Sequence, residues 1–235
     1  MPNVDPKAFW ENKILTWETG RYEDTRSAGS VLESIANRAS DSLRNRIQLA
    51  GDALAPVVAG KRVAEIGCGS ALLAERLIDA GAVHYDGYDI AEAAIANART
   101  QNATLIDAGK ASFFVQSIDD MPRLNADIVF SLGLLDWLRD DEIATLFEKT
   151  GGAEYLHAIA ERRFSLQRIL HRAYVFVSYG HKTGGYVPRY FTPQEIKTLA
   201  DRSAPRDAYV FRTPLLSFGA FVSSFPFDNT DKVDN

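Results

Sequence analysis

The sequence predicts a single α/β domain built around a mostly parallel sheet. After Gly60, short apolar runs alternate with segments of helical spacing, a pattern typical of parallel strands joined by crossover helices. The chain has 235 residues, 46% of them hydrophobic, so it can bury the core of one such domain. Strands are expected at residues 62–66, 83–88, 112–116, 126–131, 154–160, 207–212 and 217–224.

Helices are expected both between these strands and before the first one. The best marked begins at Thr192-Pro193-Gln194-Glu195, which combines an N-cap, a first-turn proline and a reciprocal glutamate. Before the first strand, Trp10, Ile14 and Trp17 share one helical face, and Ser30 with Glu33 forms a capping box. The expected helices cover residues 5–17, a segment from 30 onward, 70–80, 91–101, 140–149 and 193–202.

The pattern divides the chain into three parts. Residues 1–59 are expected to form a helical extension packed on the core, and residues 60–227 the main domain. Within that domain, the weakly patterned stretch 162–191 is interpreted as an inserted cap segment. Residues 228–235 are polar and charged, so this tail is predicted to be disordered.

Composition argues against several classes of partner. The net charge is −5 and no dense run of Lys or Arg occurs, so nucleic acid is not expected to bind. No long apolar run and no basic-then-apolar N-terminus are seen, which predicts no membrane insertion and a cytoplasmic location. Cys68 is the single cysteine, in agreement with a reducing compartment, and no metal-ligand spacing is found. Homo-oligomerisation is left open.

Two neighbouring segments predict a nucleotide site. The run VAEIGCGSA at residues 63–71 places Gly67 and Gly69 where a buried strand must turn sharply into a helix. Glycine permits the tight turn and a close approach of a ligand to the backbone. Asp89 ends the next strand and can accept hydrogen bonds from a ribose diol. The alternative is that Asp89 only caps the helix that begins near Ala91.

Three segments resemble the class I S-adenosylmethionine-dependent methyltransferases: VAEIGCGSA at 63–71, YDGYDIA at 85–91 and ADIVFSLGLLDWL at 126–138. The resemblance covers roughly residues 60–225. It implies a Rossmann-like, seven-stranded, mostly parallel sheet of order 3-2-1-4-5-7-6 with an antiparallel last strand. A dehydrogenase is disfavoured, because the third glycine of its G-x-G-x-x-G fingerprint would fall at Leu72.

The resemblance also implies roles for individual residues around the cofactor. The turn is expected to pass beneath the methionine part of S-adenosylmethionine, with Glu65 near its ammonium group or in a supporting position. Where many relatives have an acidic residue against adenine, this chain has Ser117, so Ser117, Asp119 or the backbone of Ile118 could serve. The expected cofactor-binding residues are Glu65, Gly67, Cys68, Gly69, Asp89, Ile90, Ser117, Ile118, Ser131 and Leu132.

A base is needed if the acceptor is an alcohol, whereas an amine only has to arrive neutral. His181 lies in the cap segment and is the first candidate. Asp136 follows the fourth strand near the methyl group, although it could equally begin a helix. His157 lies in the middle of the fifth strand, where a buried structural histidine is the alternative. Glu161, at the end of that strand, is a further candidate or a surface residue.

Residues 171–191 are rich in aromatic and cationic side chains and could cap a polar acceptor, with Gly184 and Gly185 as a hinge. The alternative is that the tyrosines simply pack this segment onto the sheet. The expected acceptor-binding residues are Tyr22, Tyr179, Tyr186, Arg189 and Tyr190.

The favoured function is metal-independent O-methylation of a small polar acceptor, such as a sugar or glycan precursor, with S-adenosylhomocysteine as the product. The sugar class follows from the polar cap and from a loose resemblance of FWENKILTWETGRY and GYVPRYFTPQEI to bacterial polysaccharide-modifying methyltransferases. N-methylation of a small amine and a non-catalytic S-adenosylmethionine-binding module are the alternatives.

Overall fold

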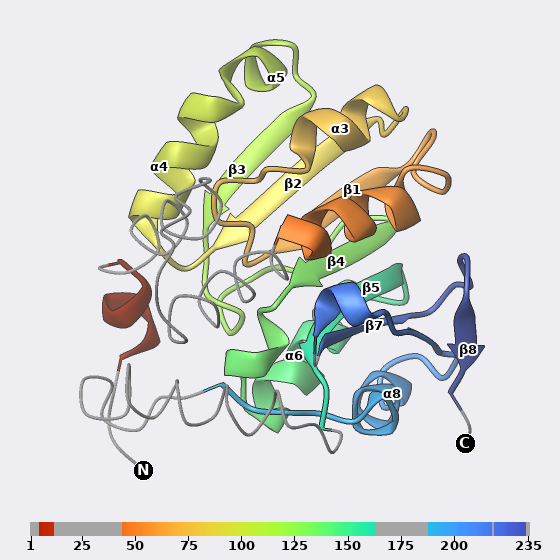
Figure 1. The fold of residues 1–235 in the computed structure, drawn as a ribbon. Helices are drawn as coiled ribbons and strands as arrows, with labels where there is room; N and C mark the ends of the chain where they lie inside the picture. Colours follow the sequence, from red (N-terminus) through yellow and green to blue (C-terminus); the bar gives the residue numbers. More distant parts are fainter. Residues whose placement is uncertain (1–4, 12–43, 163–187, 218, 234–235) are drawn as a thin grey trace, which may run out of the picture.

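A twisted sheet forms the centre of the computed structural model, which describes residues 5–11, 44–162, 188–217 and 219–233 (Figure 1). Within these ranges the sheet has eight strands in the order β3-β2-β1-β4-β5-β7-β6-β8. They are β1 (Arg62–Ile66), β2 (His84–Asp89), β3 (Ala111–Val115), β4 (Ile128–Leu132), β5 (Glu154–Ala160), β6 (Tyr209–Phe211), β7 (Gly219–Ser223) and β8 (Thr230–Lys232).

The strand directions confirm the predicted topology. β1 to β5 are mutually parallel, and β7 is antiparallel to both β5 and β6. The carboxyl ends of the parallel strands therefore meet at one edge of the sheet, where open α/β sheets bind their ligands.

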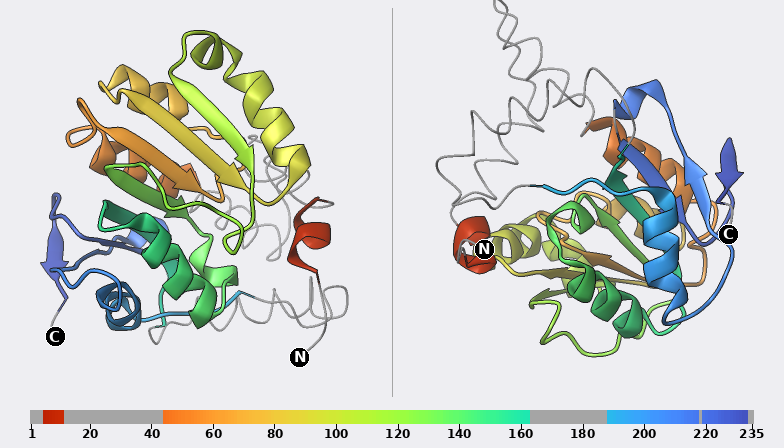
Figure 2. Two further views of the ribbon diagram at one scale, coloured as in Figure 1. Left: turned by 180° about the vertical axis from the view of Figure 1, so that it is seen from behind. Right: turned by 90° about the horizontal axis from the view of Figure 1, so that it is seen from below.

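Helices cover both faces of this sheet, which lies between two apolar layers (Figure 2). The helical segment 44–54, α3 (Ala74–Asp79) and α4 (Glu92–Gln101) pack on one face. α6 (Asp140–Thr150) and α8 (Pro193–Asp201) pack on the other. The remaining helical elements are residues 6–11, α5 (Ala103–Asp107) and the short turns η1 (Leu135–Trp137) and η2 (Pro214–Leu216).

The strand faces alternate as a two-sided core requires. In β4, Ile128 and Phe130 belong to the cluster under α3 and α4, whereas Val129 belongs to the cluster under α6 and α8. Successive side chains of a strand point to opposite faces, so each parallel strand contributes to both layers.

One predicted helix begins later than expected. The sequence predicts a helix over 70–80, but α3 begins only at Ala74. Gly67, Gly69 and Ala71 have φ values of +69°, +52° and +55°. A right-handed helix cannot contain such residues, so the turn after β1 continues for several residues before the helix can form.

The prediction that residues 228–235 are disordered is wrong for Thr230–Lys232. These residues form β8, an eighth strand in addition to the seven that the sequence predicts. β8 pairs antiparallel with β6, and Lys232 Nζ lies 2.7 Å from Asp207 Oδ2. Backbone pairing needs no apolar side chains on the strand, so composition did not reveal it. Val233 is nevertheless buried beside this strand.

Several predictions fall where the structure gives no description. Residues 12–43, which include the predicted helix from Ser30, lie outside the described residues, as do residues 163–187 of the predicted cap. The domain boundaries at 59, 60 and 227 remain predictions. None of the described helices is long and apolar enough to cross a membrane.

Candidate functional site

The turn after β1 folds back onto the end of β2. The amides of Gly67 and Cys68 both donate to Tyr88 O, at 2.8 and 3.0 Å. The Gly69 amide donates to Asp89 Oδ2 at 3.0 Å. The predicted glycine turn and the predicted ribose-binding carboxylate are thus joined directly, at the carboxyl edge of the sheet.

Asp89 has two roles in this arrangement. Its side chain is buried, and its second oxygen, Oδ1, accepts a hydrogen bond from the Ala91 amide at 2.9 Å. The carboxylate therefore holds the entrance to α4 as well as the turn, which supports the helix-capping alternative, and ribose binding by Asp89 stays a prediction. Ile90, next in the chain, is half-buried.

Glu65 and Cys68 lie buried around this turn. Tyr85, fully buried in β2, donates its phenol hydrogen to Glu65 Oε2. Burial raises the pKa of Tyr85 well above its usual range, so the phenol stays protonated and remains a donor. This contact fits the supporting role for Glu65. The Cys68 thiol lies close to Gly87, where an added Cβ would be 3.0 Å from Sγ.

The three residues that are predicted alternatives for the adenine contact follow β3. Ser117 Oγ donates to Asp120 Oδ2 at 2.7 Å and accepts from the Asp120 amide at 3.2 Å, so it closes its own turn. Ile118 is half-buried and Asp119 is exposed. The structure does not select among the three predicted alternatives.

Ser131 and His157 form a buried pair between β4 and β5. Ser131 Oγ lies 2.9 Å from His157 Nδ1, and both residues are fully buried. The imidazole stacks on Tyr155 and meets Phe147 edge-on, with centroid distances of 5.5 and 5.4 Å. Burial lowers the pKa of His157 to about 3. An enclosed, neutral imidazole is a poor proton acceptor for a ligand at the strand ends, which favours the structural alternative.

Asp136 connects the ends of β4 and β5. It lies in η1, is 6% exposed, and its Oδ1 accepts a 2.7 Å hydrogen bond from the Ala160 amide. Burial raises the pKa of Asp136 to about 6, against the lowering effects of the Arg46 charge and of the Ala160 hydrogen bond. Among the predicted bases that the structure describes, Asp136 lies at the carboxyl edge of the sheet and also has a pKa close to neutrality.

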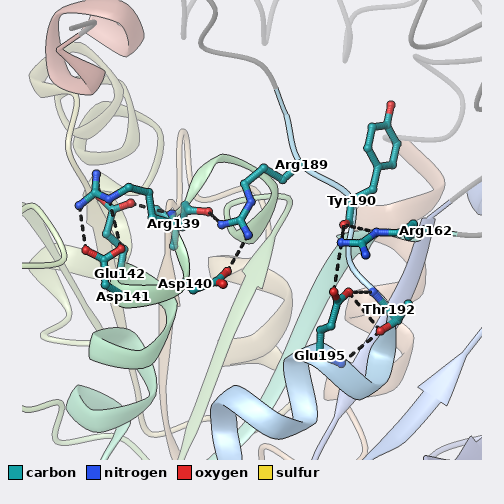
Figure 3. Close-up of polar contacts among 10 residues, drawn as sticks. Arg139, Asp140, Asp141, Glu142, Arg162, Arg189, Tyr190, Thr192 and Glu195 are labelled. Carbon is teal, nitrogen blue, oxygen red and sulfur yellow. Dashed lines mark hydrogen bonds and ion pairs between the residues drawn. The ribbon is translucent and has the colours of Figure 1, made fainter. Parts of the chain in front are cut away.

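Arg189 fastens the segment after the predicted cap to η1, as Figure 3 shows in part. Its amide donates to Asp136 O, and its Nη1 and Nη2 donate to Leu138 O and Asp140 Oδ1, each at 2.6 Å. The guanidinium also lies 4.7 Å above the Phe191 ring. These contacts hold the backbone beside Asp136, and they use both terminal nitrogens of the Arg189 side chain that the sequence predicts to bind the acceptor.

The other predicted acceptor residues are placed only in part. Tyr190 O accepts from Arg162 Nη2 at 2.9 Å, and Figure 3 shows the Tyr190 ring pointing away from the ion pairs. Tyr22, Tyr179, Tyr186 and His181 lie outside the described residues, so their roles stay predictions.

Glu161 is buried rather than a surface residue. It is 4% exposed, and Arg212 Nη2 and Nε donate to its Oε1 at 2.7 and 2.9 Å. The pair links the end of β5 to the residue after β6.

The N-terminal segment reaches the same edge of the sheet. Glu11 accepts hydrogen bonds from the Glu92 and Ala93 amides at 2.7 and 2.9 Å, and so caps α4 from outside. Trp10 meets Trp137 of η1 edge-on at 5.0 Å. Figure 1 shows residues 6–11 (red) beside the start of α4. In the part of the chain that the structure describes, no group of three or more His, Cys, Asp or Glu residues is placed to hold a metal ion.

Residues 63–151 match the family model described as a methyltransferase domain. This segment of the chain is therefore similar to methyltransferase domains. The match covers the glycine turn, Asp89 and Asp136, and it agrees with the S-adenosylmethionine-dependent family that the motifs resemble. A comparison of the sequence with curated proteins gives no match.

Solved methyltransferase structures share the fold of this chain. Magnesium protoporphyrin IX methyltransferase from Synechocystis PCC 6803, with bound S-adenosylhomocysteine, is 15% identical, with a TM-score of 0.69 over 92% of this chain and 96% of that one. An S-adenosylmethionine-dependent methyltransferase from Mesorhizobium loti is 19% identical, with a TM-score of 0.55 over 77% and 98%. Human N-acetylserotonin methyltransferase, in complex with S-adenosylmethionine, is 14% identical, with a TM-score of 0.56 over 92% and 65%.

Sequence reasoning missed one residue at this edge. Arg46, in the helical segment 44–54, donates from Nη1 to Leu132 O at 3.4 Å and lies near Asp136. It precedes the first strand and belongs to no motif, so no pattern in the sequence pointed to it.

Proposed function

We propose that the protein transfers the methyl group of S-adenosylmethionine to a hydroxyl group of a small polar acceptor, with Asp136 as the general base. The observation that carries the proposal is the position of Asp136, a buried carboxylate at the joined ends of β4 and β5. Its pKa of about 6 suits proton removal near neutral pH.

The cofactor part of the proposal rests on the glycine turn and Asp89. The turn approaches the end of β2 through the backbone amides of Gly67, Cys68 and Gly69, and glycine allows a ligand to come close to the backbone there. Asp89 lies beside this turn at the end of β2, where a carboxylate can accept hydrogen bonds from a ribose diol. The Synechocystis and human structures of the same fold hold bound S-adenosylhomocysteine and S-adenosylmethionine, respectively.

Oxygen is favoured over nitrogen as the methylated atom because of Asp136. A hydroxyl is a weak nucleophile until a base takes its proton, whereas a neutral amine needs no base. At pH 7.5 a group with a pKa of about 6 is mostly ionised, so Asp136 can accept that proton. His181 remains a predicted base in the cap segment. Sugars or glycan precursors are the acceptor class to test first, and the reaction is proposed to take place in the cytoplasm.

The test begins with calorimetric titration of the protein with S-adenosylmethionine and S-adenosylhomocysteine. Formation of S-adenosylhomocysteine is then measured with hydroxyl acceptors and with amines of matched size. We expect turnover with hydroxyl acceptors, and an Asp136→Asn variant should lose about 10²–10⁴-fold in kcat without losing cofactor affinity. Turnover with amines alone would indicate N-methylation, and binding with no turnover would indicate a non-catalytic module.

A further inference from the structure

Segment 188–192 is connected to Asp136 by two routes at the carboxyl edge of the sheet. In the first, the Arg189 amide donates directly to Asp136 O at 2.6 Å. In the second, the Phe191 amide donates to Ala160 O at 3.0 Å, and the Ala160 amide donates to Asp136 Oδ1 at 2.7 Å. The backbone oxygen and the carboxylate of Asp136 are thus each held by hydrogen bonds that lead to the same segment.

The Arg189 side chain extends this connection from η1 to the start of α6. Its Nη1 donates to Leu138 O and its Nη2 to Asp140 Oδ1, each at 2.6 Å, as Figure 3 shows. The guanidinium also lies 4.7 Å above the ring of Phe191, which is buried. A planar guanidinium with several N–H donors can make these contacts together, whereas the ammonium group of a lysine cannot.

The exposure of this ion pair argues against a mainly stabilising role. The side chains of Arg189 and Asp140 are 40% and 65% exposed, and exposed ion pairs contribute little to the free energy of unfolding. η1 is a single short turn, Leu135–Trp137, with few hydrogen bonds of its own. The contacts from Arg189 therefore serve to locate this turn, and with it the side chain of Asp136.

We infer that Arg189 is a positioning residue, which holds η1 so that the Asp136 carboxylate lies at the carboxyl edge of the sheet. A general base has to lie within hydrogen-bond reach of the acceptor hydroxyl, and a small displacement of a catalytic group lowers the rate steeply. The catalytic part of the inference rests on the proposed function, whereas the position of Asp136 can be tested without turnover.

Loss of the Arg189 side chain can act on Asp136 in two opposite directions. Burial is the largest cause of the raised pKa of Asp136, and the charge of Arg46 lowers that pKa. When η1 loosens and water reaches the carboxylate, the pKa falls from about 6 towards its ordinary value of 3.8. Loss of a nearby positive charge alone would instead raise the pKa. The direction of the change therefore separates positioning from a charge effect.

The test compares the wild type with Arg189→Gln, Arg189→Lys and Arg162→Gln. Arg162 is the matched control, since it bonds Tyr190 O of the same segment and pairs with Glu195, and within the described ranges it makes no hydrogen bond or ion pair with η1. NMR of isotope-labelled aspartate carboxyl groups measures the pKa of Asp136, and an Asp136→Asn variant identifies its resonance. Turnover of a hydroxyl acceptor is measured at pH 8. Calorimetry gives the affinity for S-adenosylhomocysteine, and circular dichroism melting checks that each variant is folded.

Arg189→Gln should lower the pKa of Asp136 from about 6 towards 3.8, and should lower kcat about tenfold or more with unchanged affinity for S-adenosylhomocysteine. Arg189→Lys should recover part of both losses, because a lysine can keep the ion pair with Asp140. Arg162→Gln should behave as the wild type.

An unchanged or raised pKa of Asp136 in folded Arg189→Gln, an unchanged kcat in that variant, or the same changes in Arg162→Gln would overturn the inference. A lowered pKa in Arg189→Gln together with no turnover by the wild type would instead reject the proposed function, and the role of Arg189 in holding Asp136 would stand.

Discussion

Replacement of Asp136 by Asn should make the protein more stable and less active at the same time. Asp136 is buried, and burial raises its pKa from 3.8 to about 6. The folded protein therefore holds the proton more tightly than the unfolded chain does, and ionisation of Asp136 at higher pH destabilises the fold. Asn has nearly the same shape, carries no charge, and can still accept the hydrogen bond from the Ala160 amide.

The magnitude follows from the difference between the two pKa values. A difference of about 2.2 units corresponds to about 3 kcal/mol of destabilisation once the group is ionised in both states. This penalty is fully present above pH 7. It declines as the pH falls through 6 and is only about 1 kcal/mol at pH 4.5. An unpaired amide hydrogen in the Asn variant would subtract part of the gain, so about 3 kcal/mol is an upper value.

Urea denaturation of both proteins between pH 4.5 and 8 measures this difference. The Asn variant should gain up to about 3 kcal/mol in its free energy of unfolding at pH 8, or roughly 6–12 °C in Tm, and less at pH 4.5. An Asn variant that is less stable at pH 8, or a difference that does not change with pH, would refute the reasoning about Asp136.

Three further predictions concern the surrounding residues. Asp89→Ala should weaken S-adenosylhomocysteine binding by about 1–3 kcal/mol in calorimetry, and Asp89→Asn, which keeps an acceptor oxygen, should lose less; equal affinities for all three proteins would remove Asp89 from the site. Arg212→Ala should lower the free energy of unfolding in urea by about 3 kcal/mol, because it removes the Arg212 cation from the buried carboxylate of Glu161. Replacing Glu161 by Gln in the same protein should restore much of the loss, and no restoration would contradict the pairing. His157, with its pKa lowered to about 3, should show no NMR titration between pH 5 and 8. The contribution of neutral His157 to the free energy of unfolding is complete above pH 6.5 and should decline as the pH falls toward 3. A titration midpoint near 6.5 would disprove the enclosure of the imidazole.

Most of the fold was predictable because its elements are marked locally. Thr192 and Glu195 form the predicted reciprocal cap of α8, and the strand over 154–160 is found at Glu154–Ala160. The start of α3 was not predictable, because Ala71 adopts a positive φ that alanine rarely has. The sequence analysis missed β8 because this strand forms by pairing with the backbone of β6. The composition of residues 228–235 does not indicate such pairing.

The site was predictable where it lies on motifs and not where it depends on tertiary contacts. Asp89 and Gly69 follow strand ends, so their meeting was expected, and the structure joins them. The contacts of Arg189 with η1 and the approach of Arg46 to Leu132 join segments far apart in the sequence. No spacing rule relates such segments, and only the packed structure brings them together.

The short strand β8 has a consequence for self-association. β6 has only three residues, and without β8 its outer hydrogen-bonding groups would form the free edge of the sheet. Such an edge is a template for pairing with another chain. Thr230–Lys232 covers it with a strand whose side chains include Asp231 and Lys232, and these charges disfavour further strand addition. Residues Thr230–Lys232 thus protect the sheet from edge-to-edge aggregation, and removing them by truncation at Phe227 would expose the edge of β6 while leaving the glycine turn untouched.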